Sequence, residues 1–266
     1  MVDLTKKIYD GAPEDFCWVG FGSGSGTNIR ECSYVIPPCL VFSDRPSAGI
    51  LSLDELKDVP KLVLDGFKFC GSRKHSGYEQ KCVEFNDVLL KKLKDFEKRY
   101  RSIDLIVLGG YMRLIKDPLL SEYKDKIINV HPADLSILDE TNDRMFVGAN
   151  AVYDSVVAKE KSTRSSVIIV DSLVDHGEIL VQGPKLAVWD GVLQENIEED
   201  LLRSYATLHQ QVQKRQSDWP ALTLTLDLIS KGELSLGHEK IFFDEWRGVY
   251  FRGSQLDFKG LDMDNY

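Results

Sequence analysis

Short runs of apolar residues alternate along this chain with longer segments in which apolar and charged residues recur at helical spacing. The apolar runs occur at 16–21, 39–42, 103–108, 126–130 and 166–170. The first three lead directly into turn residues, as Gly109 and Gly110 follow the third. A continuous apolar run of this length indicates a strand that is buried on both faces, as in parallel sheets.

The segments between the runs have the pattern of helices. Within 84–100, Phe85, Leu89, Leu93 and Phe96 recur three or four residues apart with lysines between them, which predicts an amphipathic crossover helix. Further helices are expected at 149–158, 196–213 and 220–231, the last ended by Gly232. Strands and helices in alternation predict an α/β fold with a mostly parallel, doubly wound (Rossmann-like) sheet and helices on both faces.

The end of the chain changes pattern. Two apolar runs at 240–243 and 249–251, separated by a glycine-containing turn, predict a C-terminal β-hairpin. No repeat or low-complexity linker marks an internal boundary. We therefore expect an N-terminal extension at 1–16, one α/β domain at 17–234, and the hairpin and tail at 235–266.

Charge and cysteine content narrow the classes of partner. The 266 residues carry 42 acidic and 33 basic side chains, for a net charge of −9, which disfavours broad contact with nucleic acid or anionic membranes. No stretch is long and apolar enough for a signal peptide or a membrane span. Five cysteines show neither a C-x-x-C pair nor zinc spacing. We expect a cytoplasmic protein with reduced, mostly buried thiols and no metal.

A glycine-rich segment, 22–28, follows the first predicted strand. Glycines let backbone N–H groups approach an anion closely, and a following helix adds partial positive charge, so phosphate is the expected ligand; a turn without a ligand is the alternative. Asn28 stands where a Walker A lysine would be needed, and Thr27 breaks the register of G-x-G-x-x-G. Asp44, at the end of the second strand, leaves an NAD(P)-dependent oxidoreductase as an alternative.

Two further motifs carry candidate chemistry. Asn129 and His131 lie two residues apart at the end of a predicted strand, so their side chains project together. An amide and an imidazole side by side can stabilise the oxygen of a carbonyl that is becoming tetrahedral. Asp175, in a later turn, could orient His131 and raise its pKa; a backbone-bonded histidine and a turn-capping aspartate are the alternatives.

Taken in order, the motifs G-S-G-S-G-T-N, D-L-I-V-L-G-G-Y-M-R-L-I, I-I-N-V-H-P and S-S-V-I-I-V-D-S-L-V-D-H-G-E-I-L resemble those of the folate-dependent formyltransferase family, in the branch that acts on glycinamide ribonucleotide in purine biosynthesis. The resemblance spans about 17–234. It implies transfer of a formyl group from 10-formyltetrahydrofolate, without a metal, by a monomer or homodimer.

The resemblance also implies roles for individual residues. Asn129, His131 and Asp175 match the catalytic residues. The other matched positions bind substrate phosphate (Gly24, Ser25, Gly26, Thr27 and Asn28), folate (Met112, Arg113, Leu114, Ile115, Asp171, Ser172, Leu173 and Val174) and, near the family's glutamate, the acceptor (Gln194 and Glu195).

The chain departs from the family pattern mainly after His131. A polar stretch through Asp143 is longer than the family's loop, and Gly148-Ala149-Asn150 stands where a further histidine is expected. These changes concern the acceptor more than the fold or the formyl donor. A different phosphorylated amine, such as an amino sugar nucleotide, and a folate-binding relative without turnover therefore remain as alternatives.

Overall fold

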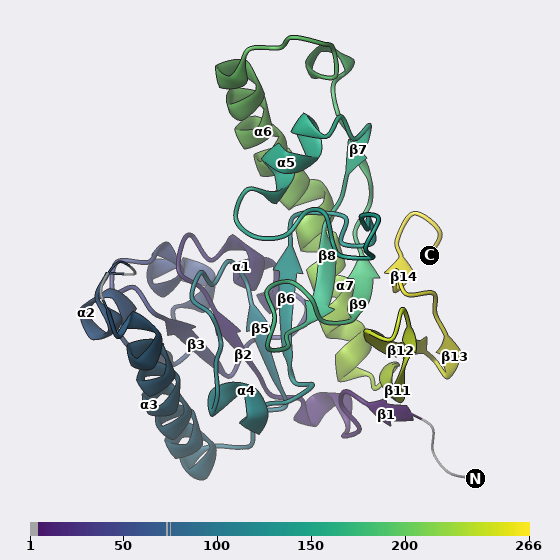
Figure 1. The fold of residues 1–266 in the computed structure, drawn as a ribbon. Coiled ribbons are helices and arrows are strands. Elements are labelled where there is room, and N and C mark those ends of the chain that lie inside the picture. The colour runs from purple at the N-terminus through teal and green to yellow at the C-terminus, as the bar shows by residue number, and fades with distance from the viewer. Residues whose placement is uncertain (1–4, 73, 75) are drawn as a thin grey trace. The chain divides into compact units, whose positions relative to one another are not determined.

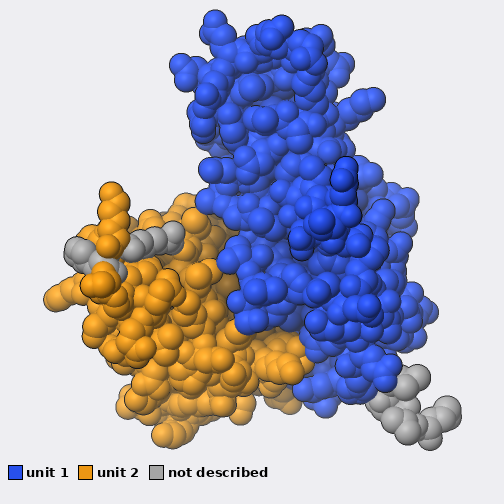
Figure 2. Space-filling view, in the orientation of Figure 1, with its two compact units in different colours: residues 1–10, 130–266 blue, residues 11–129 orange. Residues whose placement is uncertain are grey.

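The computed structural model describes residues 5–72, 74 and 76–266, so the first four residues of the expected N-terminal extension lie outside the described part. The chain divides into two compact units (Figure 2), which are described one at a time. One is formed by Gly11–Asn129, and the other by Met1–Asp10 together with Val130–Tyr266. The chain passes from one unit to the other within strand β6, Ile127–His131.

The unit of Gly11–Asn129 is built on parallel strands in the order β6-β5-β2-β3-β4. The strands that precede β6 along the chain are β2 (Trp18–Phe21), β3 (Leu40–Ser43), β4 (Lys61–Val63) and β5 (Leu105–Leu108). Every residue of β2, β3 and β5 is buried, as their continuous apolar runs predict. The α/β class with a mostly parallel sheet is thereby confirmed.

Helices connect these strands (Figure 1). They are α1 (Thr27–Ser33), α2 (Gly66–Cys70), α3 (Tyr78–Arg99) and α4 (Leu119–Glu122), with short 3-10 turns η1 (Pro13–Asp15), η2 (Gly49–Ser52) and η3 (Asp54–Leu56). Helix α3 is the expected crossover helix, and it buries Phe85, Leu89, Leu93 and Phe96. It begins earlier than the pattern indicates because its buried face extends back to Cys82.

Strands of the second unit pair in both directions. Strand β9 (Ile179–Gln182) pairs antiparallel with β8 (Ser166–Ile169) and parallel with β14 (Leu261–Asp262). A separate short pair joins β7 (Ser162–Thr163) to β10 (Leu186–Ala187). The helices are α5 (Ala151–Val157), α6 (Glu199–Gln213) and α7 (Trp219–Ser230), with the 3-10 turn η4 (Asp190–Val192) and a π-helical turn η5 (Lys214–Asp218) that joins α6 to α7.

The expected C-terminal hairpin is confirmed as part of an antiparallel sheet in the order β1-β11-β12-β13. Its strands are β1 (Thr5–Lys7), β11 (Leu234–Phe242), β12 (Trp246–Phe251) and β13 (Ser254–Gln255). The expected glycine-containing turn is wrong, because Gly248 lies within β12. The turn between β11 and β12 instead uses Phe243 and Asp244, whose φ angles are 53° and 58°.

The thiols follow the sequence expectation for the most part. All five cysteines are free; Cys17, Cys32, Cys70 and Cys82 are buried, and Cys39 is half-buried. Within the described ranges, no helix has the length and apolar character needed to cross a membrane.

Candidate active site

The glycine-rich segment forms the connection from β2 to α1. Gly26 has a φ of 73° and directly precedes Thr27, the first residue of α1. A Cβ at Gly26 would overlap the side chain of Ile50, whereas a Cβ at Gly24 would meet nothing within 4 Å. Packing therefore requires a glycine at position 26 but not at position 24, where the backbone borders open space.

Thr27 gives this segment an unused polar group. Its hydroxyl oxygen is buried and has no hydrogen-bond partner among the residues that the structure describes. A buried hydroxyl in that state is costly unless a ligand or water completes its bonding. The position is thus suited to an anionic oxygen near the start of α1.

Asp44 does not provide the free carboxylate that a dinucleotide's ribose would need. It is buried, accepts a hydrogen bond from the Ser23 hydroxyl at 2.5 Å, and lies 3.4 Å from the Nε atom of Arg113. Both contacts are internal to the protein. The observation that favoured an NAD(P)-dependent oxidoreductase is therefore explained by a structural ion pair.

The segment 112–115 presents two kinds of side chain. Met112 and Leu114 are exposed, and Ile115 is buried. The side chain of Arg113 is only 12% exposed, with its guanidinium 5.0 Å from the centre of the Phe85 ring and its Nη1 atom 3.3 Å from the Tyr78 hydroxyl. Arg113 is thus held inside its unit, while its two neighbours leave apolar surface open to a ligand.

His131 is fixed at both ring nitrogens. Its Nε2 atom lies 2.8 Å from the carbonyl oxygen of Phe146, and its Nδ1 atom lies 3.3 Å from an Asp175 carboxylate oxygen. Because a carbonyl oxygen only accepts, Nε2 carries a hydrogen in either protonation state. The position at which the ring gains or loses a proton is therefore Nδ1, beside the carboxylate.

The environment sets the charge of this imidazole. Burial lowers the pKa of His131 below its usual 6.5, although the Asp175 carboxylate and the Phe146 carbonyl favour the protonated ring. The nearby Arg144 guanidinium acts in the same direction as burial. Asp175 thus raises the pKa, as expected from the sequence, but desolvation outweighs this effect and the net shift is downward.

Asp175 is held in an unusual backbone conformation. Its φ is 51°, in the left-handed region that residues with a Cβ seldom adopt. One carboxylate oxygen accepts a hydrogen bond from the backbone N–H of Gly148 at 2.9 Å and also faces His131. The side chain is only 12% exposed, so the carboxylate is largely shielded from water.

Asn129 lies on the same strand as His131, two residues earlier, and is half-buried. Alternation along β6 gives the two side chains the same orientation relative to the strand. Of the three candidate catalytic residues, the structure records a direct contact between His131 and Asp175. A role for Asn129 beside them stays a prediction.

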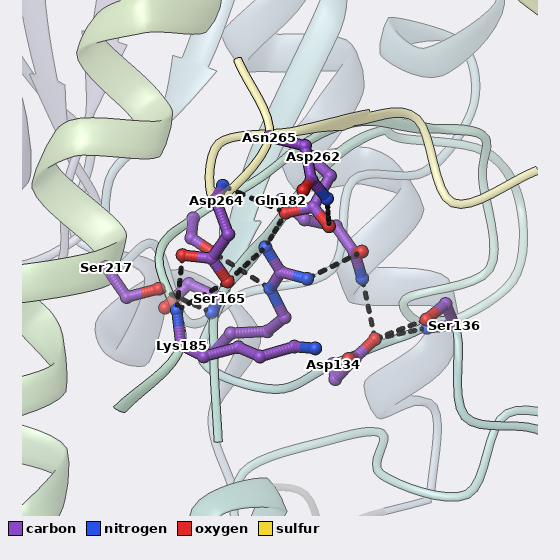
Figure 3. A network of polar contacts seen from close by, with 11 residues as sticks. Asp134, Ser136, Ser165, Gln182, Lys185, Ser217, Asp262, Asp264 and Asn265 are labelled. Atoms are coloured by element: carbon purple, nitrogen blue, oxygen red, sulfur yellow. Dashed lines mark hydrogen bonds and ion pairs between the residues drawn. The ribbon is translucent and has the colours of Figure 1, made fainter. Parts of the chain in front are cut away.

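The longer stretch after His131 is an ordered part of its unit. The Ser166 hydroxyl donates to the carbonyl of Ala133 at 2.8 Å and accepts from the N–H of Leu135 at 3.1 Å. An Asp134 carboxylate oxygen accepts from the Gln182 amide at 2.6 Å and also from Ser136 (Figure 3). These bonds fix the chain direction immediately beyond the histidine.

The same network reaches the end of the chain (Figure 3). The buried Arg164 donates from Nε to the carbonyl of Gly183 at 2.8 Å and pairs with Asp262 and Asp264. It also lies 3.3 Å from the Gln182 amide oxygen. Strand β14 is therefore anchored by charge as well as by pairing with β9.

The turn 171–174 has a polar base and an apolar tip. Asp171 accepts a hydrogen bond from the His176 Nδ1 atom at 2.6 Å, which raises the pKa of His176, and it also bonds the N–H of Leu173. Leu173 and Val174 are 60% and 52% exposed. Two large apolar side chains are therefore presented to solvent next to Asp175.

Gln194 and Glu195 lie on an exposed segment. The Gln194 amide donates to the carbonyl of Asp190 at 3.1 Å, and Glu195 forms an exposed ion pair with Lys159. Their recorded contacts do not involve His131 or Asp175. Their role with an acceptor stays a prediction.

Sequence reasoning missed three residues that hold the histidine–aspartate pair: Arg144, Phe146 and Gly148. Phe146 and Gly148 act through main-chain atoms, and Arg144 donates to main-chain carbonyls. Such roles leave no side-chain motif. The available signals were the unusual length of the preceding polar stretch and the presence of Gly148-Ala149-Asn150 where a further histidine is expected. Among the described residues, no three His, Cys, Asp or Glu side chains gather as a metal site would require.

Comparison with known proteins identifies the family of this chain. A profile of the formyl transferase family matches residues 31–211, which include β6 and the Asp175 turn. The phosphoribosylglycinamide formyltransferase of Bacillus subtilis is 28% identical over 222 residues, covering 80% of this chain and 96% of that protein. The structure of the Bacillus halodurans phosphoribosylglycinamide formyltransferase, 26% identical, aligns with a TM-score of 0.56 over 81% of this chain and 96% of that one.

A more distant structure supports the fold. The phosphoribosylglycinamide formyltransferase of Coxiella burnetii, at 21% identity, aligns with a TM-score of 0.63 over 93% of this chain and 98% of that one. The profile and the structures thus agree on a formyltransferase similar to these enzymes. This chain belongs to the formyl transferase family.

Proposed function

We propose that this protein transfers a formyl group from 10-formyltetrahydrofolate to the amine of glycinamide ribonucleotide. The observation that carries the proposal is the His131–Asp175 pair, in which Phe146 fixes the hydrogen on Nε2 and leaves Nδ1 for chemistry. The pair lies within the segment that the family profile matches. Its residue types and geometry suit proton transfer during acyl transfer to an amine.

In its neutral form, the imidazole suits the first step. Attack of the amine on the formyl carbon gives an ammonium nitrogen that must lose a proton, and the Nδ1 lone pair of His131 can take it. The imidazolium so formed is stabilised by the adjacent Asp175 carboxylate. The carbonyl then re-forms as the bond between the formyl carbon and N10 of the folate breaks, and His131 gives its proton to N10. The protein thus ends in the state in which it began.

The oxygen of the formyl group needs donors while it carries negative charge. We assign this role to the Asn129 amide during the attack, and to Nδ1 of His131 as well once it has taken the proton from the amine. Removing one such donor in other acyl-transfer enzymes costs about 10²–10³-fold in kcat.

Substrate binding is assigned to segments with matching chemistry. The open backbone at Gly24 and the unpartnered hydroxyl of Thr27 support a role for 24–28 in binding the acceptor's phosphate. The exposed apolar side chains of Met112, Leu114, Leu173 and Val174 support contacts with the flat ring of the folate. These assignments follow the matched family positions.

A side-by-side assay tests the function. The purified protein is incubated with 10-formyltetrahydrofolate and either glycinamide ribonucleotide or an amino sugar nucleotide, and formylated product is quantified by mass spectrometry. We expect product with glycinamide ribonucleotide. If only the amino sugar nucleotide is formylated, glycinamide ribonucleotide is not the acceptor. If the protein binds folate but formylates neither compound, it is a relative that has lost turnover.

A further inference from the structure

Arg144 and Trp246 hold the backbone of the turn that carries Asp175. We propose that these two side chains are positioning residues for the catalytic pair, keeping the Asp175 carboxylate against His131. The inference rests on the proposed function for its kinetic part only, because the arrangement is also testable through the ionisation of His131. Neither residue lies in the four sequence motifs that resemble those of the family.

Three consecutive carbonyl groups of the turn accept hydrogen bonds from these two side chains. Arg144 donates from its two terminal nitrogens to the carbonyls of Asp175 and Gly177, the latter at 2.9 Å. The indole N–H of Trp246 donates to the carbonyl of His176, between them, at 2.6 Å. We call this arrangement the carbonyl clamp.

The two side chains of the clamp also contact each other, and a neighbouring ion pair adds a further contact. The Arg144 guanidinium lies 4.9 Å from the centre of a Trp246 ring, within the range of a cation–π interaction. Two residues from distant parts of the sequence therefore support each other as well as the turn. Next to Trp246, Arg247 forms a two-point ion pair with Glu178 at 2.7 and 3.0 Å, which ties β12 to the residue after the turn.

The segment with Arg144 contacts both members of the catalytic pair. Arg144 binds the main chain of Asp175, the Phe146 carbonyl accepts from His131, and the Gly148 N–H donates to the Asp175 carboxylate. These three positions alternate along the segment. A shift of the segment would therefore move the partners of the imidazole and of the carboxylate together.

The conformation of Asp175 shows why external support is needed. Aspartate adopts the left-handed region more readily than most residues with a Cβ, but the region remains less favourable than the right-handed one and gains from local hydrogen bonds. The bond from Gly148 restrains the carboxylate, but the backbone restraint comes from the clamp. Without it, the turn would be free to relax and carry the carboxylate away from the Nδ1 atom.

Arg144 retains its positive charge in this setting. Burial lowers the pKa of its guanidinium to about 10, opposed by Asp171, Asp175 and Glu178. The charge-conserving variant Arg144→Lys therefore isolates geometry, because lysine keeps a cation but has no planar fork to reach two carbonyls. Trp246→Phe removes a single N–H and keeps an aromatic ring beneath the guanidinium.

Two readouts test the clamp. We expect Arg144→Lys and Trp246→Phe to lower kcat, by about 10- to 100-fold for the arginine variant, with KM changed less than about twofold because no substrate contact is removed. NMR titration of the His131 imidazole should show a lower pKa in Arg144→Lys, since Asp175 no longer favours the protonated ring as strongly. Arg203→Lys and Trp189→Phe, on exposed side chains outside the pair, are the matched controls.

The outcomes separate the clamp from the proposed function. If the variants only lower the melting temperature, with kcat and the His131 titration as in the parent protein, the clamp is a structural feature and the inference is overturned. If the titration shifts while the parent protein transfers no formyl group, the clamp stands and the proposed function fails. Recovery of the parent His131 titration in Arg144→Ala on adding guanidinium, but not ammonium, at equal low-millimolar concentration would further support it.

Discussion

His131 Nε2 donates to the carbonyl oxygen of Phe146 at 2.8 Å, and this one bond decides which edge of the imidazole can do chemistry. With Nε2 committed as a donor, only Nδ1 exchanges a proton, and Nδ1 faces Asp175. A backbone carbonyl, which no substitution of Phe146 removes, thereby selects the tautomer. We therefore propose that carboxylate and imidazole function as a unit.

Removing either member of that unit should nearly abolish transfer. We expect His131→Ala and Asp175→Asn each to lower kcat by about 10²–10⁴-fold, the range associated with a lost general acid–base group. Steady-state kinetics with circular dichroism measures both turnover and folding. Folded variants that retain the parent rate would contradict the assigned roles.

The pH dependence of kcat follows from the direction of the His131 pKa. Because burial lowers this pKa below 6.5, the neutral ring persists into mildly acidic solution, and kcat should decline only as the pH falls through the lowered value. Asp175 favours the protonated form, so Asp175→Asn should displace the decline to still lower pH. A pH–rate profile checks both statements; a decline centred above pH 6.5 would be inconsistent with them.

Two buried histidines should make the protein less stable in acid. Burial lowers the pKa of both His131 and His209, so each binds fewer protons in the folded state than in the unfolded one. The free energy of unfolding is therefore highest above about pH 6.5, the pKa of a histidine in the unfolded chain. It decreases as the pH falls from there through the lower pKa of each folded-state histidine. Urea unfolding at pH 7.5 and 5.5, on the parent and on His209→Gln, measures the effect; the variant should lose less stability on acidification.

Glycines 24 and 26 should differ sharply under the same substitution. Gly26→Ala places a Cβ at a φ of 73° and against Ile50, so it should cost at least about 1–2 kcal/mol in the free energy of unfolding. Gly24→Ala meets open space and should leave stability within about 0.5 kcal/mol. Thermal and urea unfolding of the two variants compare them directly; equal losses would argue against this account of the segment.

Thr27→Val tests the proposed phosphate contact without changing the shape of the side chain. It removes the buried, unpartnered hydroxyl, so stability should not fall, whereas KM for the phosphorylated acceptor should rise several-fold with little change in kcat. Calorimetric titration of the acceptor gives the affinity independently. An unchanged acceptor affinity would remove Thr27 from the site.

The fold was predictable to the extent that periodicity reports burial. Strands β2, β3 and β5 are buried along their whole length, and their apolar runs show it. Strand β4 escaped notice because none of its three residues is buried, and β14 because it has two residues and pairs with a distant strand. Short strands such as these form because they pair with strands elsewhere in the chain, and the hydrophobic pattern of their own residues does not show those partners.

The site divides in the same way. His131 and Asp175 occur in recognisable motifs, so the sequence could propose them as a pair, and the structure places their side chains 3.3 Å apart. Arg144 and Trp246 act on carbonyl groups of other residues, and only three-dimensional placement shows it. The direction in which the His131 pKa is shifted could not be predicted from the sequence either, because it depends on how far burial outweighs one neighbouring carboxylate.

The most direct test of the central claim is a formyl-transfer assay with 10-formyltetrahydrofolate and glycinamide ribonucleotide, run in parallel on the parent protein and on His131→Ala. We expect formylglycinamide ribonucleotide from the parent protein and a rate at least about 10²-fold lower from the folded variant. Absence of product from a folded parent protein that binds both substrates, or equal rates from the two proteins, would contradict the account.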